Sequence, residues 1–137
     1  MFSIYTADFP NSLRHAGVPL GTTSIRYLLY ADDLVLLASS APELQGALDC
    51  LAEYTSRFRL TVNVTKTKCM MFYKGYCPKP SFFYSGTPIE LCSSFTYLGV
   101  VLTTRMSSTK HIDYVLAKAN GKIGFLFAKL PLNECSS

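Results

Sequence analysis

The sequence predicts an α+β fold, with packed helices on a small antiparallel sheet. Short apolar segments bounded by Gly, Pro, Asn and Asp indicate strands joined by turns. Two longer segments, 41–58 and about 108–130, repeat apolar residues at helical spacing. The chain has 137 residues, of which 49% are hydrophobic, so it is long enough to bury a core and too apolar to be disordered.

The first part of the chain predicts the end of a helix followed by a loop. Residues 1–13 present an irregular helical face with no capping residue before it, made by Phe2, Ile4, Tyr5, Phe9 and Leu13. Gly17, Pro19 and Gly21 then favour a loop.

A β-hairpin over about 23–38 follows, with Asp32 and Asp33 at its tip in the segment Tyr-Ala-Asp-Asp. Both arms are nearly continuous in apolar residues, which predicts strands buried on both faces. Two neighbouring charges there are costly unless a partner compensates them, and a divalent cation is the usual partner. A solvated turn is the simpler alternative, because Asp is common in turns. An ordinary exposed hairpin would alternate, however, so the apolar arms favour a functional origin.

The helix over 41–58 has clear start signals. Ser40 is the expected N-cap, Glu43 completes a capping box, and Pro42 is tolerated in the first turn. We expect one apolar face of this helix to pack on the core through Leu44, Ala47, Leu48, Leu51, Tyr54 and Phe58.

The chain is then expected to be extended over 60–64 and 68–73, on either side of a basic turn at 65–67. A Gly- and Pro-rich connection follows.

The remaining residues predict a short hairpin, a strand and a last helix. The hairpin covers 82–91 and turns at Gly86, and the strand covers 95–102. The helix covers about 108–130 and ends at Pro131, which cannot continue it.

Charge, cysteine content and hydrophobicity limit the classes of protein to which this chain can belong. The net charge of +4 is compatible with nucleic acid without requiring it. Five widely spaced cysteines without a Cys-x-x-Cys pair favour reduced intracellular thiols over zinc or disulfides. No apolar run reaches the roughly 20 residues of a membrane span, and the N-terminus has no secretion signal. We therefore expect an intracellular protein without membrane contact, in the nucleus or the cytoplasm.

The Tyr-Ala-Asp-Asp hairpin and the segments after it resemble the reverse transcriptases (RNA-directed DNA polymerases) of non-LTR, LINE-type retrotransposons. In that family the hairpin is followed by a helix, a lysine-bearing segment, and a strand-turn with aromatic, Leu and Gly residues. This chain has the helix 41–58, then Asn-x-x-Lys-Thr-Lys within 60–68, then Tyr-Leu-Gly-Val within 95–100. Residues 2–10 are similar to the helix after the family's Gln-Gly loop, so the resemblance covers nearly the whole chain.

The resemblance implies nucleotidyl transfer by two metal ions, on an RNA template and a DNA primer. Asp32 would be the metal-ligating, catalytic carboxylate and Asp33 its supporting neighbour, with Mg²⁺ as the ion because hard cations take oxygen ligands. Lys66 would match the lysine that protonates the departing pyrophosphate as a general acid. A solvated turn lysine is the alternative for Lys66.

Further contacts to primer or nucleic acid are implied for Tyr30 and Lys68, and the resemblance places a primer grip at Tyr97, Leu98 and Gly99. A core strand that ends at Gly is the alternative for the last three.

The resemblance also implies a division of the chain into a partial palm, residues 1–106, and the start of a thumb, residues 107–137. The family's first catalytic Asp, its Gln-Gly loop and its fingers lie upstream of the matched segments and are not in this sequence. Two carboxylates at one tip cannot hold two ions about 4 Å apart without an opposing ligand. We therefore expect that this fragment alone does not polymerise DNA.

Two other readings stay open. A non-catalytic remnant could bind RNA or a protein partner through a basic and aromatic stretch, formed by Lys66, Lys68, Lys74 and Lys79 with Phe72, Tyr73 and Tyr76. Lysines that protect a strand edge explain the same pattern. The chain could also be a relic without selected activity. In each case an open sheet edge beside the hairpin predicts self-association.

Overall fold

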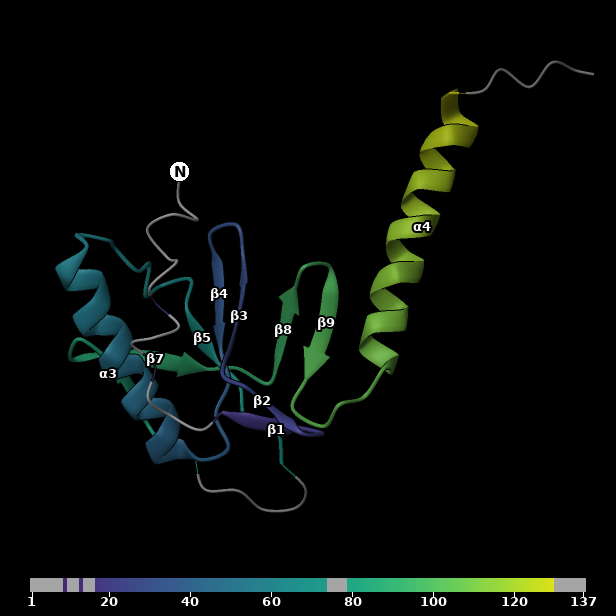
Figure 1. Cartoon of the computed structure of the whole chain (residues 1–137). Helices are drawn as coiled ribbons and strands as arrows, with labels where there is room; N and C mark the ends of the chain where they lie inside the picture. Colours follow the sequence, from purple (N-terminus) through teal and green to yellow (C-terminus); the bar gives the residue numbers. More distant parts are fainter. Residues whose placement is uncertain (1–8, 10–12, 14–16, 74–78, 130–137) are drawn as a thin grey trace, which may run out of the picture. The chain divides into compact units, whose positions relative to one another are not determined.

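The computed structural model describes Phe9, Leu13 and residues 17–73 and 79–129, with side chains placed up to Lys122. Eleven elements follow one another in these residues (Figure 1): β1 Val18–Leu20, β2 Thr23–Ile25, β3 Tyr27–Tyr30, β4 Asp33–Leu36, α3 Ala41–Arg57, β5 Lys68–Cys69, β6 Phe82–Tyr84, β7 Thr87–Leu91, β8 Ser94–Tyr97, β9 Val100–Thr103 and α4 Thr109–Lys129. The α+β class predicted from the sequence is confirmed.

The chain divides into two compact units. The first unit is Met1–Cys69 with Pro78–Leu91, and the second unit is Met70–Cys77 with Cys92–Ser137. Within the described residues, the first unit therefore holds β1 to β7 and α3, and the second holds β8, β9 and α4.

Helix α3 begins where the sequence places its cap. Ser40 is extended, and its hydroxyl accepts a hydrogen bond from the Glu43 amide, while Pro42 lies in the first turn. The helix buries Ala47, Leu48, Leu51 and Tyr54, as its apolar spacing predicts.

The core of the first unit forms between α3 and the hairpin β6–β7. Phe82, Tyr84 and Ile89 from the hairpin are buried, together with Phe9, Leu13 and Cys69. The ring of Phe9 lies edge-on to Tyr54 at 5.1 Å and to Tyr27 at 6.1 Å between ring centroids. Such edge-to-face pairs add to the free energy of burial. The expected N-terminal helix otherwise lies outside the described residues.

A buried hydroxyl pair also joins α3 to β6. The Oγ1 of Thr55 lies 2.7 Å from the hydroxyl of Tyr84 and donates to the carbonyl of Leu51 at 2.8 Å. Since the single Thr55 proton is used by Leu51, Tyr84 is the donor of the pair.

The hairpin β6–β7 turns as predicted, and β7 also pairs in parallel with β5 to give the strand order β5-β7-β6. Ser85 and Gly86 have φ of 48° and 78°. Positive φ at both central residues is the type I′ conformation, which matches the twist of the two strands.

Three expectations about strands were wrong. Residues 17–21 are not a loop, because Val18–Leu20 pairs with Thr23–Ile25 around a turn at Gly21. Residues 95–102 are not one strand, because the chain reverses at Leu98 and Gly99, both with positive φ, to pair β8 with β9. The extended segments around 65–67 reduce to the two residues of β5, because Asn63 draws the preceding backbone into a turn.

The predicted burial of the Asp hairpin on both faces was also wrong. Tyr30 is 62% exposed and Leu28 42% exposed, because β3 and β4 form a two-stranded sheet in the described residues. The inner side of the hairpin packs against Phe9 through Tyr27. The other side is left open within this part of the chain.

In the second unit, α4 contacts β9. Val101 donates its amide hydrogen to Nδ1 of His111 at 3.3 Å. Thr103 is buried, and its Oγ1 accepts from the amide of Ser107 at 3.0 Å just before the helix begins. The last helix is therefore confirmed over Thr109–Lys129, while its expected end at Pro131 lies outside the described residues.

Two negative findings concern the described residues alone. None of their helices is long and apolar enough to cross a membrane. Among the described cysteines, Cys50 is a free thiol.

Candidate functional site

The tip of the hairpin β3–β4 carries both predicted catalytic carboxylates. Tyr30 and Asp33 form the last pair of the antiparallel register, and Ala31 and Asp32 make the turn between them. Asp32 and Asp33 are both exposed. The arrangement therefore presents two adjacent acidic side chains to solvent, with Asp32 in the two-residue turn and Asp33 at the start of β4.

The turn contains a strained residue. Ala31 has φ of 51°, in the left-handed region that costs an L-residue with a Cβ roughly 1–2 kcal/mol. Glycine would adopt this conformation without that penalty. The backbone that orients the two carboxylates is therefore held in place by the pairing of the strands.

Strand alternation distributes the side chains of the hairpin over two faces. Asp33 shares a face with its partner Tyr30 and with the pair Leu28 and Val35. Tyr27, next to Phe9, belongs to the opposite face. Asp33 and Tyr30 are thus neighbours on the open face of the hairpin.

The base of the hairpin is tied to the start of α3. The carboxylate of Glu43 accepts hydrogen bonds from the amides of Gly17 and Ser39, both at 2.8 Å, and the Ser39 hydroxyl donates to the Gly17 carbonyl at 2.8 Å. The Leu37 amide donates to the carbonyl of Arg26 at 2.8 Å. These bonds hold the base of strands β3 and β4, which carry Asp32 and Asp33 at their other end.

Gly17 allows this close approach. A Cβ at this position would lie 2.5 Å from the carbonyl oxygen of Ile25 and 2.8 Å from Cγ of Arg26. Its φ of 78° also favours glycine. Arg26 in turn donates from Nη1 to the carbonyl of Leu13 at 3.0 Å.

The donor chemistry of the tip fits a hard divalent cation, because carboxylate oxygens are the ligands that Mg²⁺ prefers. Within the described residues, no three His, Cys, Asp or Glu side chains are grouped so that they could hold a metal ion. In this portion of the chain, Asp32 and Asp33 are therefore not grouped with a third side chain of these types.

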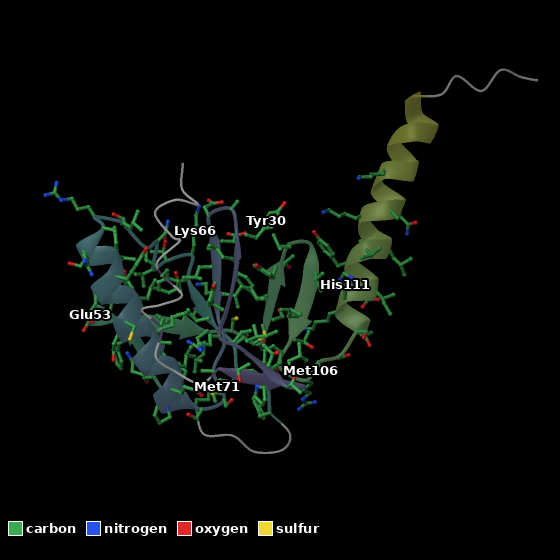
Figure 2. The ribbon with its side chains drawn as sticks, in the orientation of Figure 1. Tyr30, Glu53, Lys66, Met71, Met106 and His111 are labelled. Atoms are coloured by element: carbon green, nitrogen blue, oxygen red, sulfur yellow. The ribbon has the colours of Figure 1, made fainter. Side chains whose placement is uncertain are left out.

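The two predicted lysines have different surroundings. Nζ of Lys68 lies 2.5 Å from a carboxylate oxygen of Glu90, its register partner on β7. Lys66 is exposed and makes no ion pair with a described residue. Figure 2 shows Lys66 and Tyr30 toward the same end of the first unit, where β3 and β4 are joined. Of the two lysines, Lys66 has the charge that is open to a ligand.

Sequence reasoning missed the residue that shapes the Lys66 turn. Oδ1 of Asn63 accepts from the Thr65 hydroxyl at 2.6 Å and from the Lys66 amide at 3.2 Å. The available signal was the preference of Asn for capping turns two or three residues ahead.

The predicted primer-grip residues lie in the second unit, at the β8–β9 turn. Tyr97 is half-buried and ends β8, while Leu98 and Gly99 form the exposed turn with φ of 47° and 82°. The alternative expectation, a core strand that ends at Gly99, is not what the structure shows: the chain makes a tight hairpin turn at Leu98 and Gly99. Their roles in binding stay predictions.

Comparison with known proteins shows which proteins the chain is similar to. The family described as "Reverse transcriptase (RNA-dependent DNA polymerase)" matches residues 1–102. The chain is 28% identical, over 118 residues, to the RNA-directed DNA polymerase from the mobile element jockey of Drosophila funebris; the match covers 82% of this chain and 13% of that protein. No solved structure matches the chain.

The family model spans both the Asp hairpin and the Lys66 turn, and the similarity to a mobile-element polymerase supports the retrotransposon origin expected from the sequence. The chain belongs to the reverse transcriptase (RNA-dependent DNA polymerase) family.

Proposed function

We propose that this chain is the later part of the palm of a non-LTR reverse transcriptase, with the start of its thumb, and that its Asp hairpin contributes ligands to the metal site of nucleotidyl transfer. One observation carries the proposal: in a chain of this family, two adjacent carboxylates are exposed at the tip of a hairpin that is anchored at its base. The parent enzyme would act on an RNA template and a DNA primer.

Asp32 and Asp33 would hold Mg²⁺ through their carboxylate oxygens. When bound, the ions of such a site lower the pKa of the attacking hydroxyl and stabilise charge on the phosphate. Tyr30, on the same face as Asp33, would contact the nucleic acid. The primer grip would be formed by Tyr97, Leu98 and Gly99.

Lys66 would act as the general acid. In nucleotidyl transfer, the primer 3′-oxygen bonds to the α-phosphorus and gives up its proton to water, while the bond from that phosphorus to the pyrophosphate oxygen breaks. The Lys66 ammonium would donate a proton to this departing oxygen. Lys68 would contact the nucleic acid only after its ammonium leaves Glu90, so we propose a smaller role for Lys68 than for Lys66.

We also propose that the 137-residue polypeptide alone does not polymerise DNA. The opposing carboxylate that two ions require is not grouped with Asp32 and Asp33 in the described residues. Primer extension on an RNA template separates the possibilities. We expect no extension by the purified chain, and template-dependent extension that Asp32→Ala abolishes would overturn this proposal.

The same fragment should activate a partner that supplies the missing half. Mixed with an upstream polypeptide carrying the fingers and first catalytic Asp of a non-LTR reverse transcriptase, we expect extension that Asp32→Ala removes and Asp113→Ala, on α4, leaves intact. Extension that survives Asp32→Ala would refute the role of the Asp hairpin.

The open face of the hairpin supports a further proposal, that the fragment self-associates. Leu28 and Tyr30 expose apolar surface there, and in the described residues β3 and β4 form a two-stranded sheet whose outer edges can pair with other chains. Sedimentation velocity should show a size that rises with concentration and falls again for Leu28→Lys. A monodisperse monomer at high concentration would contradict it.

A further inference from the structure

The turn before Lys66 is organised by one residue. The carbonyl oxygen of Asn63 accepts from the amides of Lys66 at 3.2 Å and Thr67 at 3.0 Å, and from the Thr67 hydroxyl at 2.9 Å. Its side-chain Oδ1 accepts from the Lys66 amide at 3.2 Å and from the Thr65 hydroxyl at 2.6 Å. Asn63 thus contacts every residue from Thr65 to Thr67.

The side-chain bonds restrict the Lys66 backbone more than the carbonyl bonds alone would. A capping Asn oxygen satisfies an amide at the start of a turn, and its loss costs typically about 1 kcal/mol. Here the amide that is capped belongs to Lys66 itself. The side chain of Asn63 therefore selects one backbone conformation at this lysine.

Lys68, the neighbouring lysine, is held in place by its strand and by an ion pair. Lys68 lies on β5 and its ammonium is paired with Glu90, so the sheet and the ion pair hold it. Lys66 is exposed on the turn and has no ion pair among the described residues. Its position depends on the turn, and hence on Asn63.

We propose that Asn63 is a positioning residue for Lys66: its side-chain amide holds the backbone turn from which the Lys66 ammonium reaches the pyrophosphate of the substrate. This inference rests on the proposed acid role of Lys66. Asn63 itself touches neither substrate nor metal; it acts through the lysine.

The test uses the whole chain with isotope-labelled lysines, magnesium pyrophosphate as the probe, and Lys122 on α4 as the reference lysine. In the unsubstituted chain, the ε-methylene signal of Lys66 should shift on titration more than that of Lys122. In Asn63→Ala, the Lys66 response should fall to the level of Lys122. An unchanged Lys66 response in Asn63→Ala would overturn the positioning role.

Amide hydrogen exchange in the same samples separates positioning from stability. Asn63→Ala should speed exchange at Lys66 and Thr67 by roughly fivefold, with the α3 amides unchanged. Asn63→Asp keeps the acceptor oxygen and should restore slow exchange. Equal exchange at Lys66 in all three chains, or acceleration that extends equally to α3, would refute the inference.

If Lys66 is not the general acid, the pyrophosphate titration gives a different result. If Lys66 in the unsubstituted chain responds to pyrophosphate no more than Lys122, the role of Lys66 is wrong and the inference falls with it, even where the exchange data show that Asn63 holds the turn.

Discussion

The side-chain amide of Gln45 on α3 pairs with the backbone of Phe83 on β6 as a neighbouring strand would. Nε2 of Gln45 donates to the Phe83 carbonyl at 2.9 Å, and the Phe83 amide donates to Oε1 of Gln45 at 3.0 Å. β6 is the outer strand of the order β5-β7-β6. Gln45 therefore occupies part of a strand edge that pairs with no further strand in the described residues.

Removing this pairing should weaken the fold and expose the edge. We expect Gln45→Ala to lower the free energy of unfolding by about 1 kcal/mol, since two exposed hydrogen bonds are lost. Gln45→Glu keeps the acceptor for the Phe83 amide and should fall between Gln45→Ala and the unsubstituted chain. Urea titration measures both, and Glu53→Ala, on an exposed part of the same helix, serves as the control. A Gln45→Ala chain as stable as this control would contradict the edge pairing.

Substitution of Gly17 should disturb the base of the Asp hairpin. Gly17→Ala places a Cβ 2.5 Å from the Ile25 carbonyl at a positive φ, so we expect a loss of roughly 1–3 kcal/mol. Gly46→Ala is the matched control, because no atom lies within 4 Å and the residue is inside α3, where alanine gains about 0.5–1 kcal/mol. Thermal unfolding compares the two. Equal effects of the two substitutions would show that the close approach at Gly17 is absent.

The strain at Ala31 predicts opposite effects for two substitutions. Ala31→Gly removes the left-handed penalty and should raise stability by about 1 kcal/mol or less, because glycine also loses more entropy on folding. Ala31→Val places a β-branched residue at φ of 51° and should cost roughly 1 kcal/mol or more. If Ala31→Val unfolds at the same urea concentration as Ala31→Gly, the turn does not have this conformation.

The buried pair Thr55 and Tyr84 predicts an asymmetry. Thr55→Val leaves the Tyr84 hydroxyl without its acceptor, which costs about 1–3 kcal/mol. Tyr84→Phe should cost less, because the Thr55 hydroxyl keeps its bond to Leu51. The double variant should be more stable than the sum of the two losses predicts, and strict additivity in a double-mutant cycle would exclude the pair.

Local signals in the sequence predicted much of this fold. Ser40 and Pro42 placed the start of α3, because capping depends on the residues within one turn. Gly86 predicted its hairpin for the same reason. The partners of Glu43 could not be predicted this way: one of them is the amide of Gly17, 26 residues earlier, and only the folded chain brings the two together.

The predictions that were wrong concern apolar segments of the sequence. Leu98 takes a positive φ that few non-glycine residues adopt, so residues 95–102 were predicted to be one strand. The exposure of Leu28 is a second example, since a run of apolar residues does not specify what covers it. At the candidate site, the Asp tip was predicted from the apolar arms of its hairpin and Lys66 from the resemblance, whereas the hydrogen bonds of Asn63 were found only in the folded chain.

The most direct test of the central claim measures a divalent cation at the Asp tip. Mn²⁺, a paramagnetic substitute for Mg²⁺, should broaden the amide signals of Ala31, Asp32 and Asp33 first when it is added to the labelled chain. Asp32→Asn should remove this selective broadening, while Asp113→Asn, on exposed α4, should not. Broadening that is strongest away from the hairpin, or that persists unchanged in Asp32→Asn, would contradict the assignment of Asp32 and Asp33 as metal ligands.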